Sequence, residues 1–252
     1  MNPASVDVVL VRPSRAGNVA AACRAMKNMG LGRLCLVEPP QGLAAAEARA
    51  LAYGAWDVLD NARVSATMRD AVGEATLVAG TSGRPSPMAW TPRQLAEEGP
   101  ARAGAGRTAL VFGPEASGLR NDELALCHVH VHIPADPAHP SLNLAQAVLV
   151  LAYEIRISAL AAAARPVADE DRERERQRAT SAEIEAALDD LGRALLAVGY
   201  SNPDNPGKIL AEVRGLLASA GPTARETSLL RGMARQMLWA AGGVARERGP
   251  GG

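Results

Sequence analysis

Apolar and polar positions follow two different spacings along the first 164 residues of the chain. Short runs of β-branched and other apolar residues, typical of buried strands, separate longer segments whose apolar residues recur at helical spacing. The predicted strands are Val6–Val11, Leu34–Val37, Leu77–Ala79, Thr108–Phe112 and Val129–Ile133. The predicted helices are Asn18–Met29, Ala44–Ala52, Ser65–Val72, one that begins after Thr91, and Ser141–Ala164. This alternation predicts an α/β fold with a parallel sheet covered by helices on both faces.

Polar residues mark where several of these helices begin. Asn18, Ser65 and Ser141 each stand at the start of a predicted helix and belong to residue types favoured at the N-cap. Thr91 precedes Pro92 and is followed three residues later by Gln94, which is the pattern of a capping box with proline at the first helical position.

The pattern changes after residue 164. Residues 165–180 hold five arginines and five acidic residues, which is typical of a solvated linker or a charged helix. Helices are then predicted at Ser181–Gly199, Gly207–Ser219 and Thr223–Arg246, with a turn at Asn202–Pro206. We therefore expect an α/β domain at 1–164, a charged linker at 165–180 and a helical extension at 181–252.

Composition and charge narrow the class of protein. Hydrophobic residues make up 48% of the chain, which is enough to bury a core and excludes a mostly disordered protein. The formal net charge is zero, which argues against a generally basic nucleic-acid binder and leaves a local basic surface open. Such a surface could lie in the tail, since residues 181–206 carry a net charge of −4 and residues 207–252 one of +4.

Cysteine usage and the apolar segments bear on location. Three cysteines without a CxxC pair predict no disulfide framework, so a cytoplasmic location is expected. The first apolar run has no basic segment before it, so no signal peptide is predicted. Polar residues interrupt Leu142–Ala164, which favours a buried or amphipathic helix over a membrane span.

Three segments combine residues suited to binding and chemistry. Residues 18–30 form a helix with Asn18 and Arg24 on different faces. Residues 110–119 form a strand followed by a loop with glycine at both ends and Glu115 inside, and ligands bind at the carboxyl ends of such strands. Residues 140–148 place Asn143 at the start of an apolar helix, where its amide needs partners. A GxGxxG or P-loop motif is absent, which disfavours a Rossmann-type nucleotide-binding enzyme.

Together the three segments resemble the three motifs of the SPOUT superfamily, in its SpoU/TrmH branch of RNA ribose 2′-O-methyltransferases. The matching residues are Asn18, Arg24, Glu115, Gly118, Leu119, Ser141, Leu142 and Asn143. Residues 80–84, the pair Asn205-Pro206 and residues 226–233 resemble the TrmJ subgroup, the tRNA (cytidine/uridine-2′-O-)-methyltransferases. The resemblance spans residues 5–241, with two departures: Pro114 stands where a basic residue is common, and residues 83–85 replace a more basic loop.

The resemblance implies a parallel-sheet SPOUT fold with a C-terminal trefoil knot, a small all-α extension, and a homodimer with cofactor sites near its interface. It implies S-adenosyl-L-methionine as cofactor, no metal, and 2′-O-methylation of tRNA at position 32 of the anticodon loop. The implied cofactor-binding residues are Thr81, Ser82, Gly83, Gly113, Ile133, Ser141, Leu142 and Asn143. The implied catalytic residues are Arg24, Glu115, Ser141 and Asn143, and the expected RNA-binding residues are Arg24, Arg84, Arg231 and Arg235.

Elementary chemistry suggests how the catalytic residues divide the work. A ribose 2′-hydroxyl is a weak nucleophile that must lose its proton as it attacks a methyl group. An arginine with a pKa above about 12 rarely gives up its own proton, so Arg24 is expected to position the hydroxyl and stabilise the developing alkoxide. Ser141 and Asn143 would orient Arg24 and the ribose, and Glu115 would fix its loop or counter Arg24 rather than act as base.

Several alternatives remain open at this level. The substrate could be ribosomal RNA, or the chain could be an RNA-binding protein without catalysis, although Arg24, Ser141 and Asn143 argue against the latter. Cys127, His128, His130 and His132 could hold a metal ion, but histidines two residues apart on one strand are badly placed to converge, and a surface or interface strand is favoured. The arginines of the tail could bind RNA or pair with acidic residues of the preceding helix.

Overall fold

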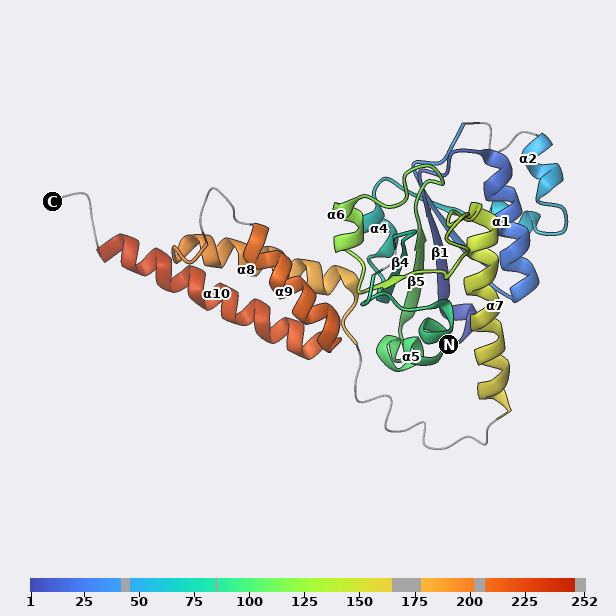
Figure 1. Ribbon diagram of the computed structural model, residues 1–252. Coiled ribbons are helices and arrows are strands. Elements are labelled where there is room, and N and C mark those ends of the chain that lie inside the picture. Colours follow the sequence, from blue (N-terminus) through green and yellow to red (C-terminus); the bar gives the residue numbers. More distant parts are fainter. Residues whose placement is uncertain (42–45, 85, 165–177, 202–206, 248–252) are drawn as a thin grey trace.

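The computed structural model describes residues 1–41, 46–84, 86–164, 178–201 and 207–247. Residues 165–177 of the predicted linker and the predicted turn at 202–206 lie outside these residues. Six strands form one parallel sheet in the order β3-β2-β1-β5-β4-β6 (Figure 1). The strands are β1 (Val6–Val11), β2 (Arg33–Val37), β3 (Arg63–Ser65), β4 (Ala75–Thr81), β5 (Arg107–Phe112) and β6 (Val129–Val131).

Helices cover both faces of this sheet, as the sequence pattern predicts. They are α1 (Ala16–Met29), α2 (Ala46–Leu51), α3 (Trp56–Asp60), α4 (Met68–Val72), α5 (Pro92–Ala103), α6 (Asn121–Ala125) and α7 (Leu144–Ala163), after a short 3₁₀ turn at Pro3–Ser5. Alternate strand residues point to opposite faces. Val8 and Leu10 therefore join the core under α1, α5 and α7, whereas Val9 and Val11 join the core on the side of α4 and α6.

Three predicted helix caps are wrong by two or three residues. Helix α1 begins at Ala16 after Arg15, so Asn18 lies inside its first turn. Ser65 ends β3, and Thr67 caps α4 instead. Asn143 caps α7, with its Oδ1 accepting the amide of Ala145 at 2.9 Å. The predicted capping box at Thr91 is confirmed.

Helix α7 has two different faces. Within the described residues it is the helix long and apolar enough, by length and composition, to cross a membrane. Its inner face packs in the core beside α1 and α5 through Val148, Leu151, Ala152 and Ile155.

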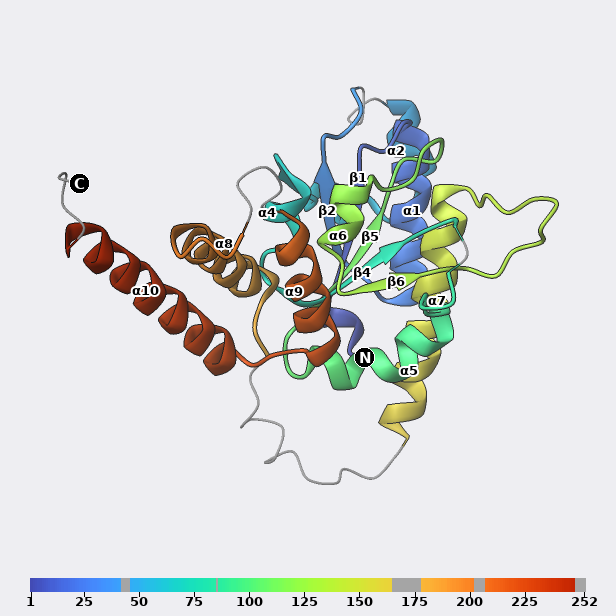
Figure 2. The same ribbon diagram turned by 60° about the vertical axis from the view of Figure 1, so that its left-hand side comes forward.

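The chain reaches α7 from β6 through a long segment that extends away from the sheet and then returns (Figure 2).

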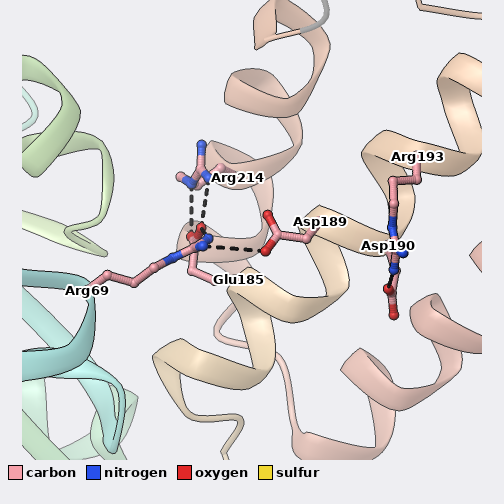
Figure 3. A network of polar contacts seen from close by, with 6 residues as sticks. All are labelled: Arg69, Glu185, Asp189, Asp190, Arg193 and Arg214. Atoms are coloured by element: carbon pink, nitrogen blue, oxygen red, sulfur yellow. Dashed lines mark hydrogen bonds and ion pairs between the residues drawn. The ribbon is translucent and has the colours of Figure 1, made fainter. Parts of the chain in front are cut away.

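The C-terminal helices are α8 (Ser181–Ala197), α9 (Gly207–Ala220) and α10 (Ala224–Glu247), and they extend from one side of the α/β region (Figure 1). Their contact with that region includes a backbone hydrogen bond of 3.1 Å from Ala182 to Gly73. Glu185 of α8 is 6% exposed and accepts hydrogen bonds from Arg69 of α4 at 2.6 Å and from Arg214 of α9 at 2.9 and 3.0 Å (Figure 3). One carboxylate therefore joins the sheet region to two helices of the tail.

Candidate functional site

A cavity of about 260 Å³ lies at the carboxyl ends of β4, β5 and β6. The loops that follow these strands form its wall, because parallel strands release their loops at the same edge of a sheet. Helix α7 closes one side with Leu144 and Ala147. Seven of the eight expected cofactor-binding residues line the cavity: Thr81, Ser82, Gly83, Gly113, Ile133, Ser141 and Leu142. The eighth, Asn143, adjoins them as the cap of α7.

Glycine is required where the loop after β5 folds back on itself. A Cβ on Gly113 would lie 2.4 Å from the carbonyl carbon of Gly118 and from the amide nitrogen of Leu119. Gly118 has a φ of +67°, in the region that favours glycine, and its amide donates to the carbonyl of Pro114 at 2.8 Å. By contrast, nothing lies within 4 Å of a Cβ placed on Gly83. The cavity wall therefore exposes backbone to a bound molecule.

A chain of polar side chains links three separate segments beside the cavity. Glu115 accepts a hydrogen bond from the hydroxyl of Ser14 at 2.7 Å and another from the amide of Asn18. Asn18 in turn accepts a hydrogen bond from the amide of Asn143 at 3.2 Å. The loop after β5, the first turn of α1 and the start of α7 are thus tied together, and all three segments carry the motifs identified in the sequence.

Glu115 remains charged at neutral pH. Burial alone would raise the pKa of its carboxyl group, but hydrogen bonds from Ser14, Asn18 and backbone amides outweigh this effect, and the pKa is lowered. A carboxylate of lowered pKa is a poor proton acceptor. Its contacts instead fix the loop, and its partners within the chain are Ser14 and Asn18 rather than Arg24.

The expected arginines lie outside the cavity or at its rim. Arg24 is exposed on α1 and does not line the cavity of its own chain. Within the described residues it takes part in no hydrogen bond or ion pair. Arg84 is exposed at the cavity wall, and Ser141 is exposed there too. The structure therefore gathers Glu115, Ser141 and Asn143 but leaves Arg24 apart from them.

An ion pair that the sequence did not reveal supports the loop after β5 at the end where this loop enters α6. Arg12 follows β1 with a φ of +46° and bonds both oxygens of Glu123 on α6, with Nη2 to Oε2 at 2.9 Å. Glu123 also accepts the backbone amide of Arg120 at 2.7 Å. Burial would raise the pKa of this carboxyl group, yet Arg12 and the Arg120 amide lower it. Arg12 and Glu123 are separated by 111 residues, so no local sequence pattern could predict that they form a pair.

The histidines around β6 bond to the backbone and do not converge. His128 accepts the amide of Val78 at 3.2 Å, and burial lowers its pKa to about 4. His130 contacts the carbonyl of Leu124 at 3.0 Å, and His132 contacts that of Ser82 at 3.1 Å. In the described part of the chain, no three His, Cys, Asp or Glu side chains are grouped to hold a metal ion.

The arginines of the tail divide into two groups. Arg231 bonds Asp190 at 2.9 Å, and Arg193 also contacts this carboxylate (Figure 3 shows Asp190 with Arg193). Arg214 bonds Glu185. Arg235 is exposed and has no ion pair among the described residues. Pairing with the acidic helix therefore holds for Arg214 and Arg231 but not for Arg235.

Comparisons with known proteins agree with this arrangement. Residues 5–153 match the model of the SpoU rRNA Methylase family, and residues 182–248 match that of the tRNA methyltransferase TrmJ C-terminal domain. The tRNA (cytidine/uridine-2′-O-)-methyltransferase TrmJ of Klebsiella pneumoniae is 40% identical over 235 residues, covering 91% of this chain and 94% of the relative. The tRNA (cytidine/uridine/adenosine-2′-O-)-methyltransferase TrmJ of Pseudomonas aeruginosa is 39% identical over 254 residues, covering 96% and 97%.

Solved structures show the same relationship. The crystal structure of TrmJ from Z. mobilis ZM4 is 32% identical, has a TM-score of 0.75 and covers 94% of this chain and 99% of that one. A structure concerned with 2-OH methylation of C/U34 on tRNA is 26% identical, has a TM-score of 0.50 and covers 64% of this chain and 99% of that one. The fold is shared with the SpoU methyltransferase AviRb of Streptomyces viridochromogenes, solved with AdoMet, at 20% identity, with a TM-score of 0.50 and covering 62% and 60%.

The family matches at 5–153 and 182–248 thus include the segments that form the cavity and most of the tail, and the relatives align with more than nine-tenths of the chain. The chain belongs to the SpoU family of RNA methyltransferases, within the group of TrmJ tRNA 2′-O-methyltransferases.

Proposed function

We propose that the protein is a cytoplasmic, homodimeric enzyme that uses S-adenosyl-L-methionine to methylate the ribose 2′-hydroxyl at position 32 of the tRNA anticodon loop. The observation that carries this proposal is the cavity at the carboxyl ends of β4, β5 and β6, whose wall consists of the motif loops. The similarity to TrmJ proteins covers 91% of the chain and includes the tail, which supports the choice of tRNA over ribosomal RNA.

The cavity fits an adenosine-containing cofactor. Its volume approaches the range of about 300–1,000 Å³ typical of small-molecule pockets. Gly83 and Gly118 leave open space where a side chain would project, so backbone groups can contact a ligand directly. Leu119, Leu142 and Leu144 supply an apolar wall for an aromatic base. When bound, the cofactor supplies an electrophilic methyl group.

The protein's own residues then prepare the nucleophile. Arg24 holds the ribose hydroxyl with its adjoining phosphate and stabilises the negative charge that develops on the 2′-oxygen as its proton passes to solvent water. Ser141 and Asn143 orient the ribose at the cavity wall, and Glu115 holds the loop through Ser14 and Asn18. Arg24 does not line the cavity of its own chain, so Arg24 of one subunit serves the cavity of the other subunit.

A homodimer is supported by the outer face of α7. Leu149, Tyr153, Ile157 and Leu160 recur at helical spacing on this face and are 40–52% exposed. A continuous apolar stripe of this kind marks an interaction surface. Helix α1, which carries Arg24, packs beside α7, so a two-fold contact over the stripe would bring both subunits' α1 helices close to it.

We also propose that the chain forms a trefoil knot and divides into a catalytic domain at 1–164, a linker at 165–180 and an all-α extension at 181–252. The strand order supports the knot, since the chain passes from β5 beyond β4 to β6 and then returns to pack α7 on α1. Separate family-model matches at 5–153 and 182–248 support the division.

Nucleotide mapping tests the function. The full-length protein would be incubated with S-adenosyl-L-methionine and unmodified tRNA or ribosomal RNA, and 2′-O-methylnucleosides would be located by mass spectrometry. Methylation at position 32 of tRNA supports the proposal. Methylation at position 34 or in ribosomal RNA would support the proposed reaction but contradict the proposed substrate position. Binding of tRNA without methyl transfer would indicate an RNA-binding protein without catalysis.

A further inference from the structure

One face of α10 collects exposed side chains that the internal packing does not use. At about 100° per residue, the side chains of Arg225, Ser228, Arg235, Gln236 and Trp239 fall within one third of the helix circumference. All five are exposed, and Trp239 is 77% exposed. The opposite face, with Thr227 and Ala234 buried, packs toward α8. We call these five exposed residues the Trp239 face.

The Trp239 face carries positive charge that nothing within the described residues neutralises. Arg225 and Arg235 have no ion pair there, whereas Arg231, which points toward α8, bonds Asp190. Glu226 is turned about 100° from Arg225 and accepts hydrogen bonds from Thr223. A polyanion approaching this face would therefore meet two guanidinium groups and no carboxylate of the face itself.

A glycine in the middle of the Trp239 face is a further sign that this face contacts another molecule. Gly232 lies inside a 24-residue helix, where glycine costs about 1 kcal/mol relative to alanine. Nothing lies within 4 Å of a Cβ placed on it, so packing within the described residues does not require the missing side chain. It leaves a flat stretch two turns before Trp239, where another molecule can approach the helix backbone.

We infer that the Trp239 face binds an unpaired stretch of RNA, with the indole of Trp239 stacked on a base. Arg235, one turn away, would contact the phosphate beside that base, and Gln236 would hydrogen-bond the base edge. Arg225 lies 14 residues from Trp239, about 21 Å along the helix, and would contact a phosphate several nucleotides away. This inference rests on the proposed function, since it names the part of the tail that would hold the tRNA substrate.

A protein partner fits this face less well than RNA. The neighbouring face of α10 carries Leu229, Met233 and Met237, which are 38–60% exposed and would suit an apolar protein contact. The Trp239 face instead surrounds one aromatic ring with arginine and uncharged polar residues. Base stacking on an aromatic ring beside basic groups is the usual way to bind single-stranded nucleic acid.

Binding of unmodified tRNA to the full-length protein tests the inference. Variants Trp239→Ala, Trp239→Phe and Arg235→Ala would be compared with the control Leu229→Ala, an exposed apolar residue on the neighbouring face of α10. Affinity would be measured over a series of salt concentrations, with a fully paired RNA duplex as second probe. Affinity for S-adenosyl-L-methionine and the sedimentation coefficient would establish that each variant is intact.

Trp239→Ala is expected to weaken tRNA binding by about 5- to 100-fold without changing the salt slope, because stacking releases no counterions. Trp239→Phe should retain most of the affinity, and duplex binding should change little. Arg235→Ala should reduce the salt slope by about one phosphate contact. Wild-type affinity in Trp239→Ala, an equal loss for the duplex, or an altered sedimentation coefficient would overturn the inference.

Failure of the proposed function would look different. If the wild-type protein bound tRNA through Trp239 but transferred no methyl group, the catalytic proposal would fall and the RNA-binding face would stand. If the wild-type protein methylated tRNA and Trp239→Ala bound it with unchanged affinity, only the Trp239 face would be wrong.

Discussion

The side-chain amide of Asn143 donates a hydrogen bond of 3.2 Å to the side-chain oxygen of Asn18, across 125 residues of sequence. Because Asn18 also donates to the charged Glu115, its amide group can adopt one orientation only. Asn143 must therefore be a donor toward Asn18 while its own oxygen caps α7. One residue thus both begins a helix and orders the cavity wall.

Substitutions at Asn143 should separate these two roles. Asn143→Ala is expected to lose about 1 kcal/mol of stability with the cap and also to lose methyl-transfer activity. Asn143→Asp keeps an oxygen for the cap, so its thermal stability should be near that of the wild type. It cannot donate to Asn18, so its turnover and cofactor affinity should remain low. Full activity in Asn143→Asp would show that the contact with Asn18 does not matter.

Arg24→Ala should act on the chemical step rather than on folding or cofactor binding. We expect S-adenosyl-L-methionine affinity within a few fold of wild type and turnover lower by about 100-fold or more, the scale of losing a group that stabilises the transition state. The matched control is Lys27→Ala, an exposed cation one turn further along α1 that pairs with Asp57. Single-turnover methylation at the wild-type rate in Arg24→Ala would contradict the assigned role.

A mixed dimer tests whether Arg24 works across the subunit interface. Arg24→Ala and Asn143→Ala chains, each inactive alone, would be mixed and allowed to exchange. If Arg24 serves the partner's cavity, each mixed dimer contains one cavity with both intact residues. Each mixed dimer should then show about half of the activity of a wild-type dimer. Recovery would be absent if each chain used its own Arg24.

Much of the fold follows from the sequence because it depends on local pattern. Runs such as Val6–Val11 and Thr108–Phe112 carry mostly apolar residues on both faces, as expected of a parallel sheet that helices cover on both sides. The loops that follow such strands meet at one edge, so the cavity's location could be anticipated from motif order. The short elements Arg63–Ser65, Trp56–Asp60 and Asn121–Ala125 were missed, since three to five residues show no measurable period.

Tertiary contacts determine two features that the sequence pattern did not predict, the exact helix starts and the burial of Glu185. Asn18 is a good N-cap by type, but its amide is engaged by Glu115, 97 residues away, and the helix begins two residues earlier. Choosing between Ser141 and Asn143 as cap required knowledge of Asn18. The buried Glu185 reads as a surface residue in an acidic helix until Arg69 is placed beside it.

Glu185 should make the attachment of the tail depend on pH. Burial tends to raise the pKa of its carboxyl group, but Arg214 and Arg69 outweigh this effect and lower the pKa below the ordinary 4.5. A lowered folded-state pKa stabilises the protein fully above about pH 4.5, and this contribution is lost as the pH falls through the lowered pKa. Urea unfolding of wild type and Glu185→Gln at pH 7 should differ by about 1–3 kcal/mol, and the difference should shrink below pH 4.5.

Asp189→Asn provides the control for that measurement. Asp189 lies one turn from Glu185 and contacts the same arginine at 3.4 Å, but it is largely exposed. Its removal should change the unfolding free energy by less than about 1 kcal/mol at any of these pH values. Equal effects of Glu185→Gln and Asp189→Asn would mean that burial of Glu185 adds nothing to the attachment.

Placing a charge on the outer face of α7 should separate the proposed dimer. Tyr153 is half exposed at the centre of the apolar stripe, so Tyr153→Arg leaves the monomer's core unchanged but would bury an unpaired charge at a two-fold contact, at a cost of several kcal/mol. Sedimentation at micromolar concentration should then show a monomer that still binds S-adenosyl-L-methionine. Methyl transfer should be lost, because Arg24 could no longer reach the partner's cavity. The control Leu216→Arg alters an exposed leucine on α9 and should remain a dimer. A wild-type protein that sediments as a monomer, or an active monomeric Tyr153→Arg, would contradict both the dimer and the shared site.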